Sequence, residues 1–256
     1  RADPNGAGAT DDFDDATAEV HGYQALPREA LAALSLGPVE LTFGRQIVGW
    51  GEGDALSPLD VVNPRDLREP GMSDLDDLRM SVVATRVGVF LGDHRLEAMV
   101  IHEADFGLRS PPFGPYSPFT SLVQADAAAL LSDKSLRYRH AEARFAFDQQ
   151  QPLLRWVYKG PGIDLGVYAA YVMDRQGVIE LPSAATLATA DTLEITLRHP
   201  FHAVLGTSGA WAWDSLLLKW ELGASFDRVE IPQDLRDDAE LAREQLIEAI
   251  ADHDEA

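Results

Sequence analysis

The chain has 256 residues, 46% of them hydrophobic, which suits one large globular or barrel domain and excludes a collagen-like or wholly disordered chain. Its formal net charge of −21 argues against a nucleic-acid partner, because phosphates require a basic surface. Cysteine is absent, which excludes disulfides, zinc–thiolate sites and cysteine nucleophiles. The sequence has no run of about eighteen apolar residues, so a membrane role would have to come from β-strands.

Residues 1–20 are rich in Gly, Asp and Ala without an apolar period, which predicts an irregular acidic segment. Four of its carboxylates are the oxygen ligands that calcium prefers, namely those of Asp11, Asp12, Asp14 and Asp15. They lack the spacing of an EF-hand, so a solvated segment is the better interpretation. No metal and no cofactor are predicted.

Residues 21–230 are expected to form strands and loops, because apolar and polar residues alternate in several runs. Short turn signals separate paired runs at Gly92-Asp93, Gly160-Pro161-Gly162 and Asp214-Ser215, which predicts three hairpins. Further strands are predicted at 136–147 and 193–197, for a total of about eight or nine. The remaining segment, 231–256, changes to a helical period and predicts a short, acidic, amphipathic helix.

Strands with one apolar face suit two architectures, a membrane barrel and a soluble sandwich. Three features favour the barrel. The strands are long, and charged residues such as Lys219 and Glu221 repeat within single strands, as a wet lumen allows. Aromatic residues also lie near strand ends, where membrane interfaces place them: Trp156, Tyr158, Trp211 and Trp213.

The segment from Gly44 to Arg68 reads GRQIVGWGEGDALSPLDVVNPRDLR. It resembles the signature segment of a large uncharacterised family of proteobacterial outer-membrane proteins, in which G-R-Q-x-V-x-W-G-E is followed by D-V-x-N-P-x-D-L-R. The resemblance implies an all-β, antiparallel transmembrane β-barrel with a lumen-directed loop, located in the bacterial outer membrane. It implies a channel or envelope transport component for small or poorly soluble molecules, and not an enzyme.

The partners that this resemblance implies are the lipid bilayer and lipopolysaccharide, together with periplasmic or inner-membrane transport proteins. The chain begins at Arg1, without Met or a signal peptide, so we expect a processed or trimmed chain. It ends in DHDEA and not on an aromatic strand, which leaves open whether a barrel closes within these residues. The overall acidity predicts a preference for cations in any channel.

The candidate functional residues lie in the same segment: Arg45, Gln46, Trp50, Glu52, Asp60, Asn63 and Asp66. A charged loop directly after a strand could fold into a lumen and form a constriction there. The alternative is structural: Asn63-Pro64 and Asp66 would shape turns, and Arg45 would form an ion pair with Glu52 or Asp66. Both interpretations stay open from the sequence.

Two rival functions remain. One is a soluble antiparallel β-sandwich that binds a ligand or carbohydrate. The other is an outer-membrane hydrolase, but the stretch 206–210 reads GTSGA and lacks the last glycine of a nucleophile elbow. His199 and His202 are three residues apart, so on a strand they would point to opposite faces and could not bind one metal together.

Overall fold

The computed structural model describes residues 27–51, 57–69, 71, 74, 77–110, 116, 135–180 and 192–227. The acidic segment at 1–20, with Asp11, Asp12, Asp14 and Asp15, lies outside these ranges, as do Glu52 and the helix expected within 231–256. The described chain is all-β and mostly antiparallel, with one short 3-10 helix at Phe147–Gln149. No helix in the described ranges is long and apolar enough to cross a membrane.

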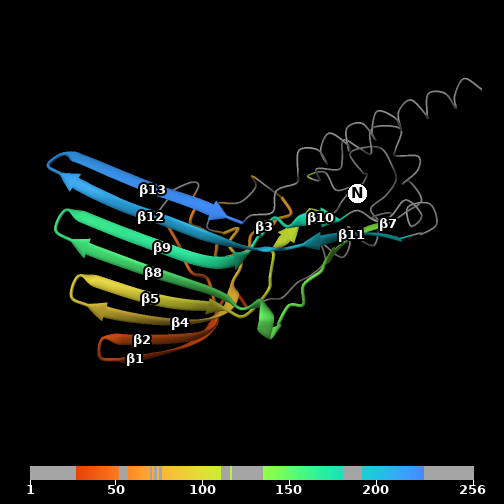
Figure 1. Cartoon of the computed structure of the whole chain (residues 1–256), viewed down its shortest axis with the longest axis horizontal. Helices are drawn as coiled ribbons and strands as arrows, with labels where there is room; N and C mark the ends of the chain where they lie inside the picture. Colours follow the sequence, from red (N-terminus) through yellow and green to blue (C-terminus); the bar gives the residue numbers. More distant parts are fainter. Residues whose placement is uncertain are drawn as a thin grey trace, which may run out of the picture.

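An eight-stranded antiparallel sheet dominates the fold (Figure 1). Across the sheet its strands are β1 (Ala30–Leu36), β2 (Val39–Gln46), β4 (Val82–Leu91), β5 (His94–Ile101), β8 (Gln151–Gly160), β9 (Ile163–Met173), β12 (Phe201–Trp213) and β13 (Leu216–Phe226). Each strand therefore pairs with its neighbours in chain order. Within the described residues β1 and β13 are the two edges, and the sheet is open between them.

Tight turns join the strands at one end of the sheet, and the long connections lie at the other end (Figure 1). The predicted turn at Gly92-Asp93 is confirmed, and Gly92 has a φ of 59°. A left-handed φ is what a two-residue hairpin turn requires and what glycine adopts without strain. The other two predicted hairpins are also confirmed, with turns at Pro161-Gly162 and Asp214-Ser215.

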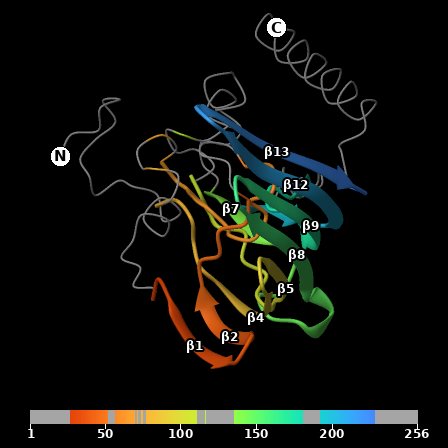
Figure 2. The same cartoon turned by 90° about the vertical axis from the view of Figure 1, so that its left-hand side faces the viewer.

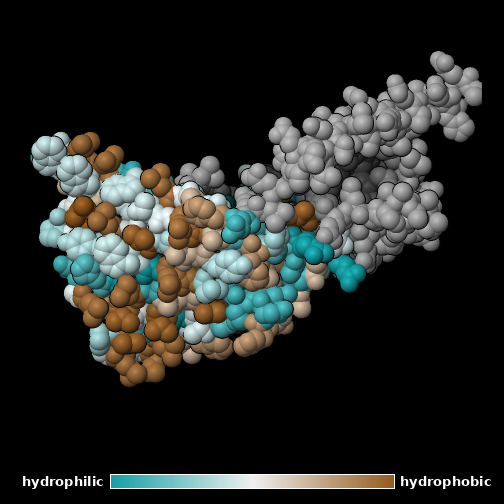
Figure 3. Space-filling view, viewed as in Figure 1, coloured by the Kyte–Doolittle hydropathy of each residue, from teal (hydrophilic) through white to brown (hydrophobic). Residues whose placement is uncertain are grey.

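The two faces of the sheet differ in chemistry, because side chains alternate between them along each strand. One face, called here the outer face, carries a row that is apolar across all eight strands: Leu34, Leu41, Val87, Ala98, Leu154, Ala169, Leu205 and Ala224. Many large apolar side chains on this face are exposed. Figure 3 shows apolar surface spread over the sheet on the side turned to the viewer.

The opposite face, called here the inner face, carries both charged residues and the hydrophobic core of the molecule. Its adjacent row consists of Ser35, Glu40, Gly88, Glu97, Arg155, Tyr168, Gly206 and Gly223. The sheet is curved, and part of the connection between β2 and β4 lies inside the curve (Figure 2). Trp50, Leu59 and Val62 from this connection pack in one cluster with buried sheet residues such as Met99 and Tyr168.

Two small sheets lie outside the main one. A three-stranded sheet has the order β10 (Val178–Glu180), β11 (Thr192–Arg198) and β7 (Ser135–His140), and β11 is parallel to β7. The second consists of β3 (Asp66–Leu67) and β6 (Leu108–Arg109). The strand predicted at 136–147 is therefore wrong beyond His140, and the strand predicted at 193–197 belongs to a small sheet and not to the main one.

Candidate functional site: the inner face of the sheet

The described residues 47–51 and 57–69, called here the inner segment, lie against the inner face of the sheet. Trp50 is fully buried, with its ring centroid 5.9 Å from that of Tyr168. The guanidinium of Arg155 lies 5.3 Å from the Trp50 ring, and its Nη1 donates to the carbonyl of Gly49 at 3.3 Å. The aromatic ring therefore attaches the start of the inner segment to β8 and β9.

Asn63 joins two stretches of backbone inside the curve. Its side-chain oxygen accepts from the Val48 N–H at 3.0 Å, and its Nδ2 donates to the Met80 carbonyl at 2.8 Å. The Gln46 side chain makes a similar buried bond, from its Nε2 to the Ala84 carbonyl at 2.9 Å. Asn63 therefore satisfies backbone groups beyond the ends of β2 and β4, and Gln46 bonds a backbone carbonyl within β4; these contacts position the start of the inner segment.

Replacing Asn63 by alanine is expected to lower the free energy of unfolding by about 1–3 kcal/mol, because a buried N–H and a partly buried carbonyl would both lose their partner. Chemical denaturation of the two proteins measures the difference. Leu67→Ala is the matched control in the same segment, since Leu67 is exposed and should change stability by less than about 0.5 kcal/mol. Equal stability of wild type and Asn63→Ala would show that these two bonds do not hold the segment.

The inner segment reaches the far edge of the sheet at β13. The Glu221 carboxylate accepts from the Leu59 N–H at 3.2 Å and from the Ser57 hydroxyl. Leu59 rests on Gly206, where a Cβ would lie 2.1 Å from a Leu59 methyl carbon and 2.7 Å from the Leu222 carbonyl oxygen. Only glycine allows this close approach, so the segment crosses the inner face from β2 to β13.

Arg45 pairs with Glu103, a carboxylate outside the family-like segment. Its Nη2 lies 2.7 Å from a Glu103 oxygen, and its Nη1 donates to the Ser81 carbonyl at 2.9 Å. Arg144 approaches the same carboxylate at 2.6 Å. Burial raises the pKa of Glu103, but the hydrogen bonds from Arg45, Arg144 and the Val83 N–H outweigh it and hold the pKa below the usual range.

The expected ion pair of Arg45 with Asp66 is wrong, because Asp66 lies beside Arg68. The Arg68 guanidinium contacts Asp66 at 2.6 and 2.9 Å, and the Arg68 N–H donates to Asp66 Oδ1 at 3.2 Å. The hydrogen bond to Asp66 raises the pKa of Arg68 above its ordinary value. Asp66 thus supports its own turn, as the structural interpretation expected. Glu52, the other expected partner, lies outside the described residues.

Asp60 has a wholly buried side chain that lies between two arginines. Arg65 and Arg79 approach one of its oxygens at 2.9 and 3.0 Å. Arg175 lies nearby, partly buried, and donates to the carbonyls of Val62, at 2.8 Å, and Asp105. Burial lowers the pKa of Arg175 to about 10, so it remains charged at neutral pH. These contacts fix the middle of the inner segment to the long connections.

Glu97 is a further buried carboxylate, and it lies on the sheet itself. Arg95 and Arg155 approach it at 2.7 and 2.9 Å, and Arg86 lies 3.9 Å away. In the register of β5 and β8, Glu97 is directly opposite Arg155, so their side chains emerge side by side on the inner face. Alternation along the strands predicted charged residues on one face, but the spacing did not show that three arginines share one carboxylate.

A pair of histidines in the long connections was also missed from the sequence. His140 Nδ1 lies 2.9 Å from His199 Nε2, and His199 Nδ1 lies 2.6 Å from the Asp174 carbonyl, to which it donates. The His199 ring stacks on Phe106 with centroids 3.4 Å apart. The two histidines are 59 residues apart, and β11 with β7 brings them together, so no local pattern could have indicated the pair.

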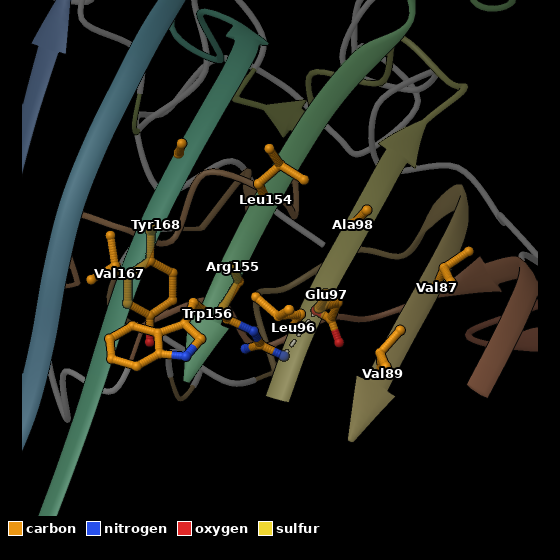
Figure 4. A pocket seen from close by; sticks show the side chains of 11 residues that line it. Val87, Val89, Leu96, Glu97, Ala98, Leu154, Arg155, Trp156, Val167 and Tyr168 are labelled. Atoms are coloured by element: carbon orange, nitrogen blue, oxygen red, sulfur yellow. Dashed lines mark ion pairs between the residues drawn. The ribbon is translucent and has the colours of Figure 1, made fainter. Parts of the chain in front are cut away.

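The four aromatic residues expected at a membrane interface lie on the outer face, toward the tight turns. Trp211 and Trp213 stack 6.1 Å apart in β12, and Trp156 stacks on His94 at 5.8 Å. Tyr158 contacts the same histidine ring. Between the strands next to Trp156 lies an apolar depression of about 430 Å³, with Ala98 and Ala169 among its lining residues (Figure 4). Arg155 and Glu97 meet on the other side of the same strands.

Among the described residues, no group of three or more His, Asp or Glu side chains could hold a metal ion. The calcium candidates of the sequence lie outside these residues. A family model described as a protein of unknown function (DUF1302) matches residues 3–236. No solved structure matches the chain.

Proposed function

The chain belongs to the DUF1302 family of proteins of unknown function, and from this membership and its two-faced sheet we propose that it forms the wall of a bacterial outer-membrane β-barrel that acts as a channel or envelope transport component. Its permeants would be small or poorly soluble molecules. The lipid bilayer and lipopolysaccharide would surround it, and periplasmic or inner-membrane transport proteins would be its partners. In this proposal it is not an enzyme.

The apolar outer face is the main observation that supports this proposal. An apolar surface that continues over eight strands is larger than the patches that soluble monomers usually expose. A ten-residue strand such as β8 is about 34 Å long, and a tilt of about 40° reduces its height to roughly 26 Å. That height matches the apolar band of about 25 Å on transmembrane barrels. Lipid is therefore the environment that suits this face.

The charged residues of the inner face favour a wall that borders water over a membrane anchor alone. Buried and half-buried ion pairs at Glu97, Glu103 and Asp60 would be costly beside lipid but are stable beside water. The inner segment narrows the space inside the curve, as a constriction loop would. The contacts of Gln46, Trp50 and Asn63 favour a positioning role for these residues, and the ion pairs of Asp60 place charge in the inner segment. Arg45 lies at the end of β2 on the same strand face as Leu41 and Phe43.

The five tryptophans of the chain offer a direct test, because Trp50 lies on the inner face and Trp156, Trp211, Trp213 and Trp220 lie on the outer face. The protein would be reconstituted in liposomes whose acyl chains carry bromine, a contact quencher of indole fluorescence. We expect strong quenching of the wild type. A variant in which only Trp50 remains should be protected.

The matched control keeps Trp220 alone, with the other four tryptophans replaced by phenylalanine. It should be quenched, since Trp220 packs beside Gly209 on the outer face. Equal quenching of the Trp50-only and Trp220-only proteins would contradict the assignment of the faces. Failure of the protein to enter liposomes would favour the soluble β-sandwich, in which the same apolar face would lie against a second sheet.

A further inference from the structure

The group of charged residues around Glu97 has more positive than negative charge. Arg86 on β4, Arg95 on β5 and Arg155 on β8 surround this carboxylate on the inner face. Glu40 is the only other carboxylate paired with them among the described residues, 3.8 Å from Arg95. Three guanidiniums therefore face two carboxylates. This set of Arg86, Arg95, Arg155, Glu97 and Glu40 is called here the arginine cluster.

The excess of positive charge is larger on the exposed side of the cluster, because the Glu97 carboxylate at its centre is buried. The Glu97 side chain is 0% exposed, whereas those of Arg86, Arg95 and Arg155 are 22%, 30% and 14% exposed. A solute on the inner side would therefore meet guanidinium groups before the central carboxylate. Each guanidinium carries five N–H donors, and one carboxylate offers about four acceptor positions, so donors remain for another anion.

A similar arrangement occurs at two further buried carboxylates, Asp60 and Glu103. The Asp60 side chain is hidden between half-buried Arg65 and Arg79, and that of Glu103 lies behind Arg45 and Arg144. Around Glu97 and Asp60 the sign of the local charge is thus opposite to the net charge of the chain. Part of the acidic excess belongs to sequence outside the described residues, such as DDFDD at 11–15.

We propose that the arginine cluster is a selectivity site for small anions that carry a carboxylate, phosphate or similar oxyanion group. Planar guanidiniums bind such groups with two parallel hydrogen bonds, and fixed arginines in a pore wall raise the local concentration of anions. This inference rests on the proposed function, since it requires the inner face to border a water-filled passage. It replaces the cation preference that the overall charge predicts.

Planar-bilayer recordings of the full protein in a potassium chloride gradient test the proposal. The wild type should show a chloride-to-potassium permeability ratio above one. Arg86→Gln together with Arg95→Gln should lower that ratio by about two- to tenfold. Glu40→Gln removes a partly exposed carboxylate of the same cluster, so it should change the ratio in the opposite direction. Inorganic phosphate, added as a probe, should block chloride current in the wild type more than in the double arginine variant.

Two controls separate charge from damage to the fold. Arg95→Gln with Glu97→Gln leaves the net charge unchanged, so it should lower the ratio less than the double arginine variant does. Lys219→Gln removes a positive charge from the inner face of β13, away from the cluster, and should have little effect. A conducting wild type that prefers potassium, or a ratio that the double arginine variant does not change, would overturn the anion site alone. Absence of any conductance would overturn the proposed channel itself.

Discussion

An arginine in place of Leu222 is expected to destabilise the protein in a bilayer by about 2–4 kcal/mol. Leu222 lies in the middle of β13 on the outer face, opposite Thr207, and its side chain is 64% exposed. In the proposed barrel this exposure is to lipid, so a guanidinium at that depth would have to leave water or distort the bilayer. Denaturant unfolding of the protein in liposomes measures the cost.

Two variants of the same strand are its controls. Leu218→Arg is also on the outer face but lies closer to the Asp214-Ser215 turn, so its cost should fall toward about 0–1 kcal/mol. Lys219→Leu changes a residue of the inner face, so its effect on the free energy of unfolding should not depend on depth in the bilayer. Equal losses for Leu222→Arg and Leu218→Arg, or a small loss for both, would mean that the outer face does not contact hydrocarbon.

Stability is expected to fall by about 3 kcal/mol between pH 6.5 and pH 4 through His199 alone. Burial lowers the pKa of His199 from 6.5 to about 4, and the residue is 1% exposed. The unfolded chain therefore binds a proton in this range that the folded protein does not bind. The contribution is fully present above pH 6.5 and is lost as the pH falls to about 4. Unfolding measured at pH 7.5, 6 and 5 follows this loss.

His199→Gln provides the comparison, because glutamine does not titrate but retains a donor and an acceptor for the Asp174 carbonyl and His140. Its unfolding free energy should depend less on pH than that of the wild type in this range. Burial also lowers the pKa of His140, so His140→Gln with His199→Gln should flatten the dependence further. The same slope in the wild type and in both variants would contradict a neutral imidazole pair in which His199 is buried.

Much of the main sheet could be predicted because its determinants are local. Side chains alternate between two faces with a period of two, so residues such as Leu216 and Leu218 were assigned to one side and Lys219 and Glu221 to the other. Turns such as Gly92-Asp93 were recognised from residues that adopt a left-handed φ. The strand predicted beyond His140 failed, because alternation alone does not show whether a partner strand is available.

The sequence by itself thus determined that the chain is rich in antiparallel strands, where its hairpins turn and which residues share a face, since each follows from near neighbours along the chain. Only the tertiary structure decided which charges meet. Arg45 contacts Glu103 across 58 residues, His140 contacts His199 across 59, and three strands contribute the arginines around Glu97. The order and register of the strands bring these groups together, and pairing of distant strands leaves no local pattern in the sequence.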